Sequence, residues 1–183
     1  MTRNKILLAV VVFGAMVLGF KLADQRAQGP AGDVRVQPSQ AVVDDPELRP
    51  LFSLPGVDGE THAISEWDGK VLVINFWATW CAPCRKEIPE FVALQNAYGE
   101  AGVQFIGVAV DTLENVIAYA EEFGINYPLL VGDEAAITAG FAYGNKIGGL
   151  PYTAIVDRDG HIVLRHQGVL SHDQAVAVLE ALL

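Results

Sequence analysis

Cysteine is scarce in this chain, and its scarcity is informative. Only two of the 183 residues are cysteines, and both lie in the segment Trp80-Cys81-Ala82-Pro83-Cys84. A zinc site needs about four ligands, but the sequence holds no second cysteine pair and its four histidines show no ligand spacing. A structural disulfide across so short a loop would constrain the unfolded chain little. A redox-active pair is therefore favoured over a metal site or an inert staple.

Basic residues are also few. The chain has 12 Lys and Arg against 22 Asp and Glu, a net charge of −10. Residues 46–183 carry seven of these basic and 18 of these acidic residues, so their net charge is −11. An acidic domain without a basic patch argues against binding to nucleic acid or to an anionic lipid surface.

Long apolar runs are missing except near the N-terminus. Ile6–Phe20 is an apolar run of 15 residues preceded by two basic residues, and extension past Lys21 to Ala23 gives 18. A spanning helix needs about 17–25 residues, and a lysine near its end can snorkel. A cleaved signal peptide is the alternative, although the residues that follow make poor cleavage sites. Residues 1–23 are predicted to be a membrane anchor or signal segment, and either one exports the rest of the chain.

The remaining chain divides into a linker and one domain. Residues 24–45 are rich in Gln, Pro, Gly and charge and show no helical or strand period, so they are predicted to form a flexible linker. Residues 46–183 have the length of a single domain. The expected location is the inner (plasma) membrane, with the domain on the periplasmic, extracytoplasmic side.

The cysteine pair lies between a predicted strand and a predicted helix. Val71–Phe76 is a continuous apolar run, which is typical of a buried strand, and a helix is expected from about Cys81 to Tyr98. At a helix N-terminus, free N–H groups and the helix dipole favour the thiolate of the first cysteine. Pro83 suits the first turn, where a missing N–H has no cost.

Strand and helix patterns alternate along the domain, which predicts an α/β fold with a central mixed β-sheet flanked by helices. Leu51–Leu54 and Thr61–Ala63 indicate an N-terminal β-hairpin. The further strands expected are Val103–Val110, Tyr127–Val131, Thr153–Val156 and Ile162–His166. The further helices expected run from a capping box at Asp111–Glu114 to Phe123, over Glu134–Tyr143, and from a capping box at Ser171–Gln174 to the C-terminus.

Three motifs in combination carry a family resemblance. They are Trp-Cys-x-x-Cys followed by Lys-Glu at 80–87, Gly-Leu-Pro-Tyr-Thr at 149–153, and Arg-His-Gln-Gly at 165–168. From about residue 51 to 183 the chain resembles the thioredoxin superfamily, and within it the membrane-anchored TlpA/ResA/CcmG (DsbE) group. The third motif is similar to CcmG and the second to TlpA or ResA, so the subgroup stays open. The resemblance implies a thioredoxin-like fold with a helix–strand insertion before a cis-proline loop.

The resemblance also implies roles for single residues. Pro151 matches the cis-proline that lies against the cysteines and exposes the backbone of Leu150 to a substrate peptide; a trans proline in a loop is the alternative. Glu87 is the expected proton acceptor for Cys84, since Asn75 stands where cytosolic thioredoxins have a buried Asp; a solvated surface Glu is the alternative. Trp80 is expected on the rim that faces the substrate rather than in the core.

The function implied is that of an extracytoplasmic thiol–disulfide reductase. Cys81 would attack a disulfide of a target such as apocytochrome c or a copper-site protein, and Cys84 would resolve the mixed disulfide. A membrane electron donor of the CcdA/DsbD kind would re-reduce the pair, and no other cofactor or metal is expected. The alternatives are a DsbA-like oxidase, although Ala-Pro lacks the His between the cysteines, and a Cu(I) chaperone, since thiolates suit Cu(I). Neither cysteine has a peroxiredoxin-like context.

Overall fold

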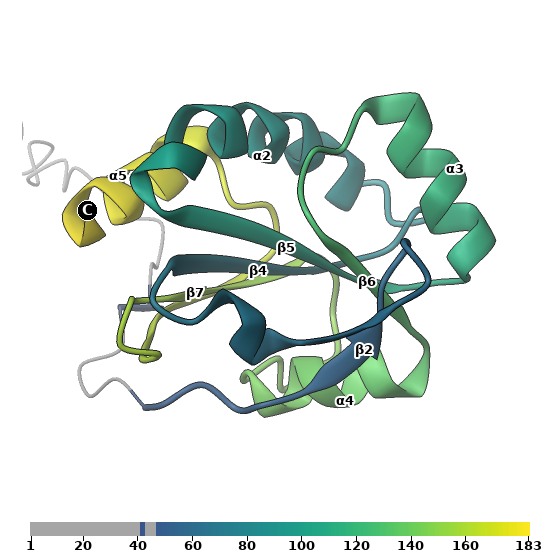
Figure 1. Ribbon diagram of the computed structural model, residues 1–183, viewed down its shortest axis with the longest axis horizontal. Coiled ribbons are helices and arrows are strands. Elements are labelled where there is room, and N and C mark those ends of the chain that lie inside the picture. Colours follow the sequence, from purple (N-terminus) through teal and green to yellow (C-terminus); the bar gives the residue numbers. More distant parts are fainter. Residues whose placement is uncertain (1–40, 43–46) are drawn as a thin grey trace, which may run out of the picture. The chain divides into compact units, whose positions relative to one another are not determined.

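Residues 41–42 and 47–183 are described by the computed structural model. Their main sheet has six strands in the order β1-β8-β7-β4-β5-β6 (Figure 1). The strands are β1 (Ala41–Val42), β4 (Val71–Trp77), β5 (Val103–Val110), β6 (Leu129–Gly132), β7 (Tyr152–Val156) and β8 (Ile162–Gln167). The β4–β5 and β5–β6 pairs are parallel, whereas β7 is antiparallel to both β4 and β8. The sheet is therefore mixed, as the sequence predicts.

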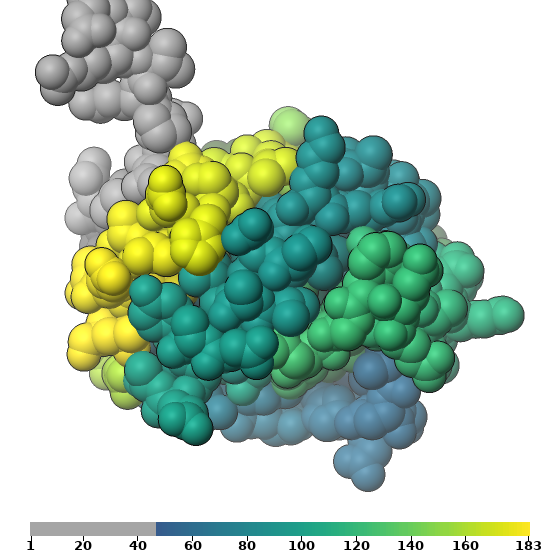
Figure 2. Space-filling view, turned by 90° about the horizontal axis from the view of Figure 1, so that it is seen from above, coloured from purple at the N-terminus to yellow at the C-terminus, as the bar shows by residue number. Residues whose placement is uncertain are grey.

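Helices cover both faces of this sheet. On one face lie α2 (Cys84–Tyr98), α3 (Leu113–Phe123) and α5 (His172–Leu182), with α2 between the other two (Figures 1 and 2). The other face carries α4 (Glu134–Ala142), the 3-10 turn Ile64–Trp67 and the hairpin of β2 (Ser53–Pro55) and β3 (Thr61–Ala63). All seven residues of β4 are buried because this strand is covered on both sides.

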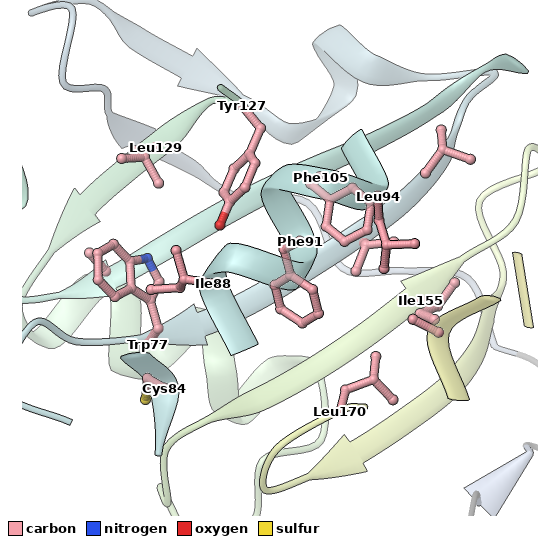
Figure 3. Close-up of a cluster of buried hydrophobic side chains, with 14 of the residues drawn as sticks. Trp77, Cys84, Ile88, Phe91, Leu94, Phe105, Tyr127, Leu129, Ile155 and Leu170 are labelled. Atoms are coloured by element: carbon pink, nitrogen blue, oxygen red, sulfur yellow. The ribbon is translucent and has the colours of Figure 1, made fainter. Parts of the chain in front are cut away.

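The packing of α2 fixes the orientation of the helix that carries Cys84. Its buried residues are Cys84, Glu87, Ile88, Phe91 and Leu94, which recur at three- and four-residue intervals on one face. Figure 3 shows the apolar members of this stripe side by side, with Cys84 at one end of the cluster. The ring of Phe91 lies 5.2 Å from that of Phe105 on β5, measured between centroids. This stripe anchors the helix on the sheet.

Most predicted elements are confirmed. The hairpin, the strand Val103–Val110, the insertion of β6 and α4, and the capping box of Ser171 and Gln174 are all present. The strand predicted at Tyr127–Val131 instead begins two residues later, at Leu129, and ends one residue later, at Gly132. These agreements support the predicted thioredoxin-like fold.

Two helix starts differ from the prediction. Helix α2 begins at Cys84 rather than Cys81, with Pro83 as its N-cap, and the Arg85 N–H donates to the Cys81 carbonyl just ahead of the helix. Helix α3 is capped by Thr112, whose hydroxyl accepts from the Asn115 N–H at 3.3 Å. The predicted capping box at Asp111–Glu114 is therefore wrong by one residue.

The N-terminal predictions lie mostly outside the described residues. Residues 1–23 and most of 24–45 cannot be compared with the structure, but Ala41–Val42, inside the predicted linker, pair with Arg165 and Leu164 of β8. The sheet thus begins at Ala41, five residues before the predicted domain boundary at 46. Within the described part of the chain, no helix combines the length and apolar character needed to cross a membrane.

Candidate active site

The two cysteines form a disulfide where β4 gives way to α2. The Cys84 N–H donates to Cys81 Sγ at 3.3 Å, so a free N–H of the first helical turn points at the first sulfur. Cys81 is 5% exposed and Cys84 is fully buried. Of the two sulfur-bearing residues only Cys81 keeps some exposed surface, and in the reduced protein the helix N-terminus would stabilise its thiolate. Cys84 is buried in the protein interior, where Cys81 is within its reach.

Glu87 lies one helical turn beyond Cys84 on the same buried face, and only 1% of its surface is exposed. Its Oε1 accepts from Asn75 Nδ2 at 2.8 Å, and its Oε2 accepts from the Leu170 N–H at 3.0 Å. Burial raises the pKa of this carboxyl from 4.5 to about 7, although both hydrogen bonds oppose the shift. The group is therefore a buried acid that can exchange a proton near neutral pH, and not a solvated surface residue.

Asn75 and Thr153 complete the surroundings of Glu87. Asn75, on β4, donates from Nδ2 to Thr153 Oγ1 at 3.0 Å as well as to Glu87. Both are buried, and β4 and β7 pair them directly. From the sequence, Asn75 is noted only as the replacement of a buried Asp, and Thr153 only as part of the Gly-Leu-Pro-Tyr-Thr motif and of a predicted strand; neither is predicted to contact Glu87. One signal was available: Asn75 is the single polar residue in an apolar strand.

The loop before β7 lies beside the end of β4, since Phe76 pairs with Tyr152. The Leu150–Pro151 peptide bond is cis, the form that the resemblance implies. Trp80 is 68% exposed and lies on the rim of the site. Together with Leu150 it lines a mainly apolar pocket of about 190 Å³, whose other walls include Ile137 of the insertion helix α4. The structure thus brings Trp80 and Leu150 together at one opening.

Asp111 holds the turn that leads into the cysteine motif. Its Oδ2 accepts from both the N–H and the hydroxyl of Thr79, and its Oδ1 accepts from the N–H of Thr112. Burial alone would raise the pKa of Asp111, but the hydrogen bonds from Thr79 and its other partners lower it overall. Asp111 is thus an ionised anchor for the chain just before Trp80, and sequence patterns assigned it only to a helix cap.

The described residues contain no group of three or more His, Cys, Asp or Glu side chains that could hold a metal ion. The reactive groups that the structure brings together here are the cysteine pair and one buried carboxyl. The expectation that no further cofactor is needed stays a prediction.

Comparison with known proteins agrees with this site. The model of the AhpC/TSA family matches residues 47–165. The thiol-disulfide oxidoreductase ResA of Geobacillus thermodenitrificans is 31% identical over 134 residues, which cover 73% of this chain and 75% of that protein.

Solved structures agree as well. A thiol:disulfide interchange protein of the thioredoxin family from Chlorobium tepidum is 33% identical with a TM-score of 0.69, covering 75% of this chain and 97% of that one. A second structure from Chlorobium tepidum, described as a thiol:disulfide interchange protein DsbE, is 27% identical with a TM-score of 0.67, covering 76% and 98%. The chain therefore belongs to the thioredoxin-like AhpC/TSA family and is a thiol–disulfide oxidoreductase of the ResA/DsbE type.

Proposed function

We propose that this oxidoreductase works as a reductase of protein disulfides outside the cytoplasm. The observation that carries the proposal is the Glu87 carboxyl, buried one helical turn from the buried Cys84, with its pKa raised to about 7 by burial. A resolving thiol must lose its proton before it can attack. A buried carboxyl with a pKa near neutrality is suited to accept that proton.

The proposed reaction has two exchange steps. The Cys81 thiolate attacks one sulfur of the target disulfide, a mixed disulfide forms, and the other target sulfur leaves as a thiolate. Cys84 then transfers its proton to Glu87 and attacks Cys81 Sγ, which releases the second target sulfur. Two electrons pass to the target, and the protein returns to the disulfide form that the structure shows. The proton held by Glu87 and a second proton from solvent convert the two target thiolates to thiols.

The apolar opening indicates how a target would be held. The exposed Trp80 and the half-buried Leu150 face a pocket that can take an apolar side chain near the target cysteine. The named relatives are thiol–disulfide oxidoreductases or interchange proteins, which supports a protein disulfide as substrate. We propose the Cys-x-x-Cys-His segment of apocytochrome c as the target, with cysteines of a copper site second.

The proposed location and electron supply rest on the N-terminal sequence. An apolar run behind basic residues would export the domain and tether it at the plasma membrane. A membrane donor of the CcdA/DsbD kind would then return electrons to the Cys81–Cys84 disulfide. Tethering near donor and targets raises their effective concentration.

Two measurements on the purified full chain test the direction of electron flow. The first is the reduction potential by redox titration, for which thioredoxin at about −270 mV and DsbA at about −120 mV mark the two ends. A value near or below about −220 mV supports a reductase, whereas a value near −120 mV would make the protein an oxidase. The second is reduction of a peptide with an oxidised Cys-x-x-Cys-His segment, with Cys84→Ser expected to accumulate the mixed disulfide on Cys81. A chain that leaves this peptide oxidised would contradict the proposed target.

A further inference from the structure

We propose that Gln167 is a positioning residue, whose side-chain amide holds the loop Gly149–Pro151 so that the backbone of Leu150 is ready to pair with an extended segment of the target. The inference rests on the proposed function, because it concerns how that site binds a protein disulfide. It gives a role to the Gln of the Arg-His-Gln-Gly motif, which the redox chemistry leaves without one.

The evidence is a set of hydrogen bonds on either side of Leu150. Gln167 Nε2 donates to the carbonyl oxygen of Gly149 at 3.0 Å and to that of Pro151 at 3.1 Å. The Gly149 carbonyl also accepts from Asn145 Nδ2 at 3.0 Å, and the Pro151 carbonyl accepts from the Gly168 N–H at 2.9 Å. A carbonyl has two lone pairs, so both of these oxygens are fully used. The single amide of Gln167 bridges the two of them across Leu150.

Leu150 itself is left free. Among the hydrogen bonds found within residues 47–183, none involves its N–H or its C=O. The residue is only half-buried and lines the apolar pocket beside Trp80. Unpaired backbone groups next to a fixed segment are a template for one more extended strand. The partner that fits is a peptide segment recognised through its main chain, not a small disulfide.

The position of Gln167 is built into the sheet. It is the last residue of β8 and pairs with Tyr152, the residue that follows Pro151. Gly149 gives the amide its space, because a Cβ there would lie 3.0 Å from Gln167 Nε2. Any side chain at 149 would therefore push against the bridging amide. The pairing of Gln167 with Tyr152 places the amide beside the loop, and the absence of a side chain at Gly149 leaves room for it.

The test compares two substrates of the full-length reduced protein. One is a peptide with an oxidised Cys-x-x-Cys segment, and the other is hydroxyethyl disulfide, which has no backbone to pair. Loss of the bridge in Gln167→Ala should lower kcat/KM for the peptide relative to hydroxyethyl disulfide on the order of tenfold, mostly through KM. Gln167→Lys, whose ammonium can donate to both carbonyls, should recover most of that ratio.

Two further variants make the result decisive. Gly149→Ala places a Cβ 3.0 Å from the bridging amide, crowds it without removing it and should lower the same ratio by a smaller factor, which keeps the test available if Gln167→Ala does not fold. Gln174→Ala is the matched control, since its side chain accepts from the Ser171 N–H at 3.0 Å in the cap of α5, so it should leave the ratio unchanged. An unchanged ratio in folded Gln167→Ala and Gly149→Ala, or equal losses on both substrates, would overturn the role of Gln167. If the wild-type protein reduces neither disulfide, the proposed function fails instead.

Discussion

Glu87 should make the oxidised protein less stable as the pH rises. Its pKa is about 7 in the folded protein against 4.5 for an ordinary Glu, because it is buried. The folded state therefore holds this proton more tightly than the unfolded state. The stabilisation that this proton contributes is fully present below about pH 4.5 and is lost progressively as the pH rises to about 7. Between pH 5 and pH 8 the loss in the free energy of unfolding comes to about 2.5 kcal/mol.

Glu87→Gln removes this titration but keeps the shape of the side chain. A glutamine oxygen can still accept from Asn75, but its NH₂ group would face the Leu170 N–H, which loses the acceptor that Glu87 Oε2 provides at 3.0 Å. Leaving that buried N–H unpaired costs about 1–3 kcal/mol at every pH. The variant should therefore be less stable than the wild type at pH 5 and about as stable at pH 8. The quantity that tests the argument is how differently the free energy of unfolding of Glu87→Gln and of the wild type changes with pH.

Urea unfolding of the disulfide-intact proteins at pH 5, 6, 7 and 8 measures this difference. Glu121→Gln, which neutralises an exposed carboxylate on α3, is the matched control and should run parallel to the wild type. The other titratable groups are common to Glu87→Gln and the wild type, so their contributions cancel in the comparison. Parallel curves for Glu87→Gln and the wild type would refute the argument, because they would mean that folding leaves the pKa of Glu87 unshifted.

Three other substitutions test the structure elsewhere. Hydrogen bonds to Glu66 and Asp58 raise the pKa of His62 above 6.5. The stability that His62 contributes is therefore present below that pH and is lost as the pH rises through the raised value. Glu66→Gln should lower the pKa of His62 in an NMR titration, and an unchanged pKa would contradict the pairing. Ser171→Ala removes the cap of α5 and should cost about 1 kcal/mol in urea unfolding, whereas no loss would mean that the cap is not formed in solution. Gly107→Ala places a Cβ 2.5 Å from Leu129 Cδ2 and should cost about 1–3 kcal/mol by calorimetry, and an unchanged Tm would show that the core can relax there.

The fold could be predicted because its strands and helices have clear periods in the sequence. The apolar runs Val71–Phe76 and Val103–Val110 mark the neighbouring parallel strands β4 and β5 to within a residue. Strand β1 could not be found this way, since Ala41–Val42 is too short to show a period and is defined by backbone pairing with β8. Edge strands that depend on a distant partner lie beyond what local patterns contain.

Some features of the site can likewise be predicted from the sequence, and others cannot. Cys81 and Cys84 are evident from their spacing, and the stripe of Cys84, Ile88, Phe91 and Leu94 places Glu87 on the buried face of α2. The bridge from Gln167 could not be predicted, because it depends on the shape of a loop 16 residues away from it in sequence. Sequence patterns give the chemistry of single residues, whereas their hydrogen-bond partners require the fold.

The pKa of Glu87 depends on its hydrogen-bond partner Asn75 as well as on its own burial. Its amide donates to Glu87 at 2.8 Å, which stabilises the ionised carboxylate against the burial that disfavours it. An Asp at this position would place a second carboxyl against the first, and two such groups cannot both ionise at that distance. With Asn the site has one titrating acid, whose pKa near 7 lets it both take and return a proton at neutral pH. In this protein the acid beside the dithiol therefore comes from the helix, and the strand supplies the neutral donor that keeps its pKa in the working range.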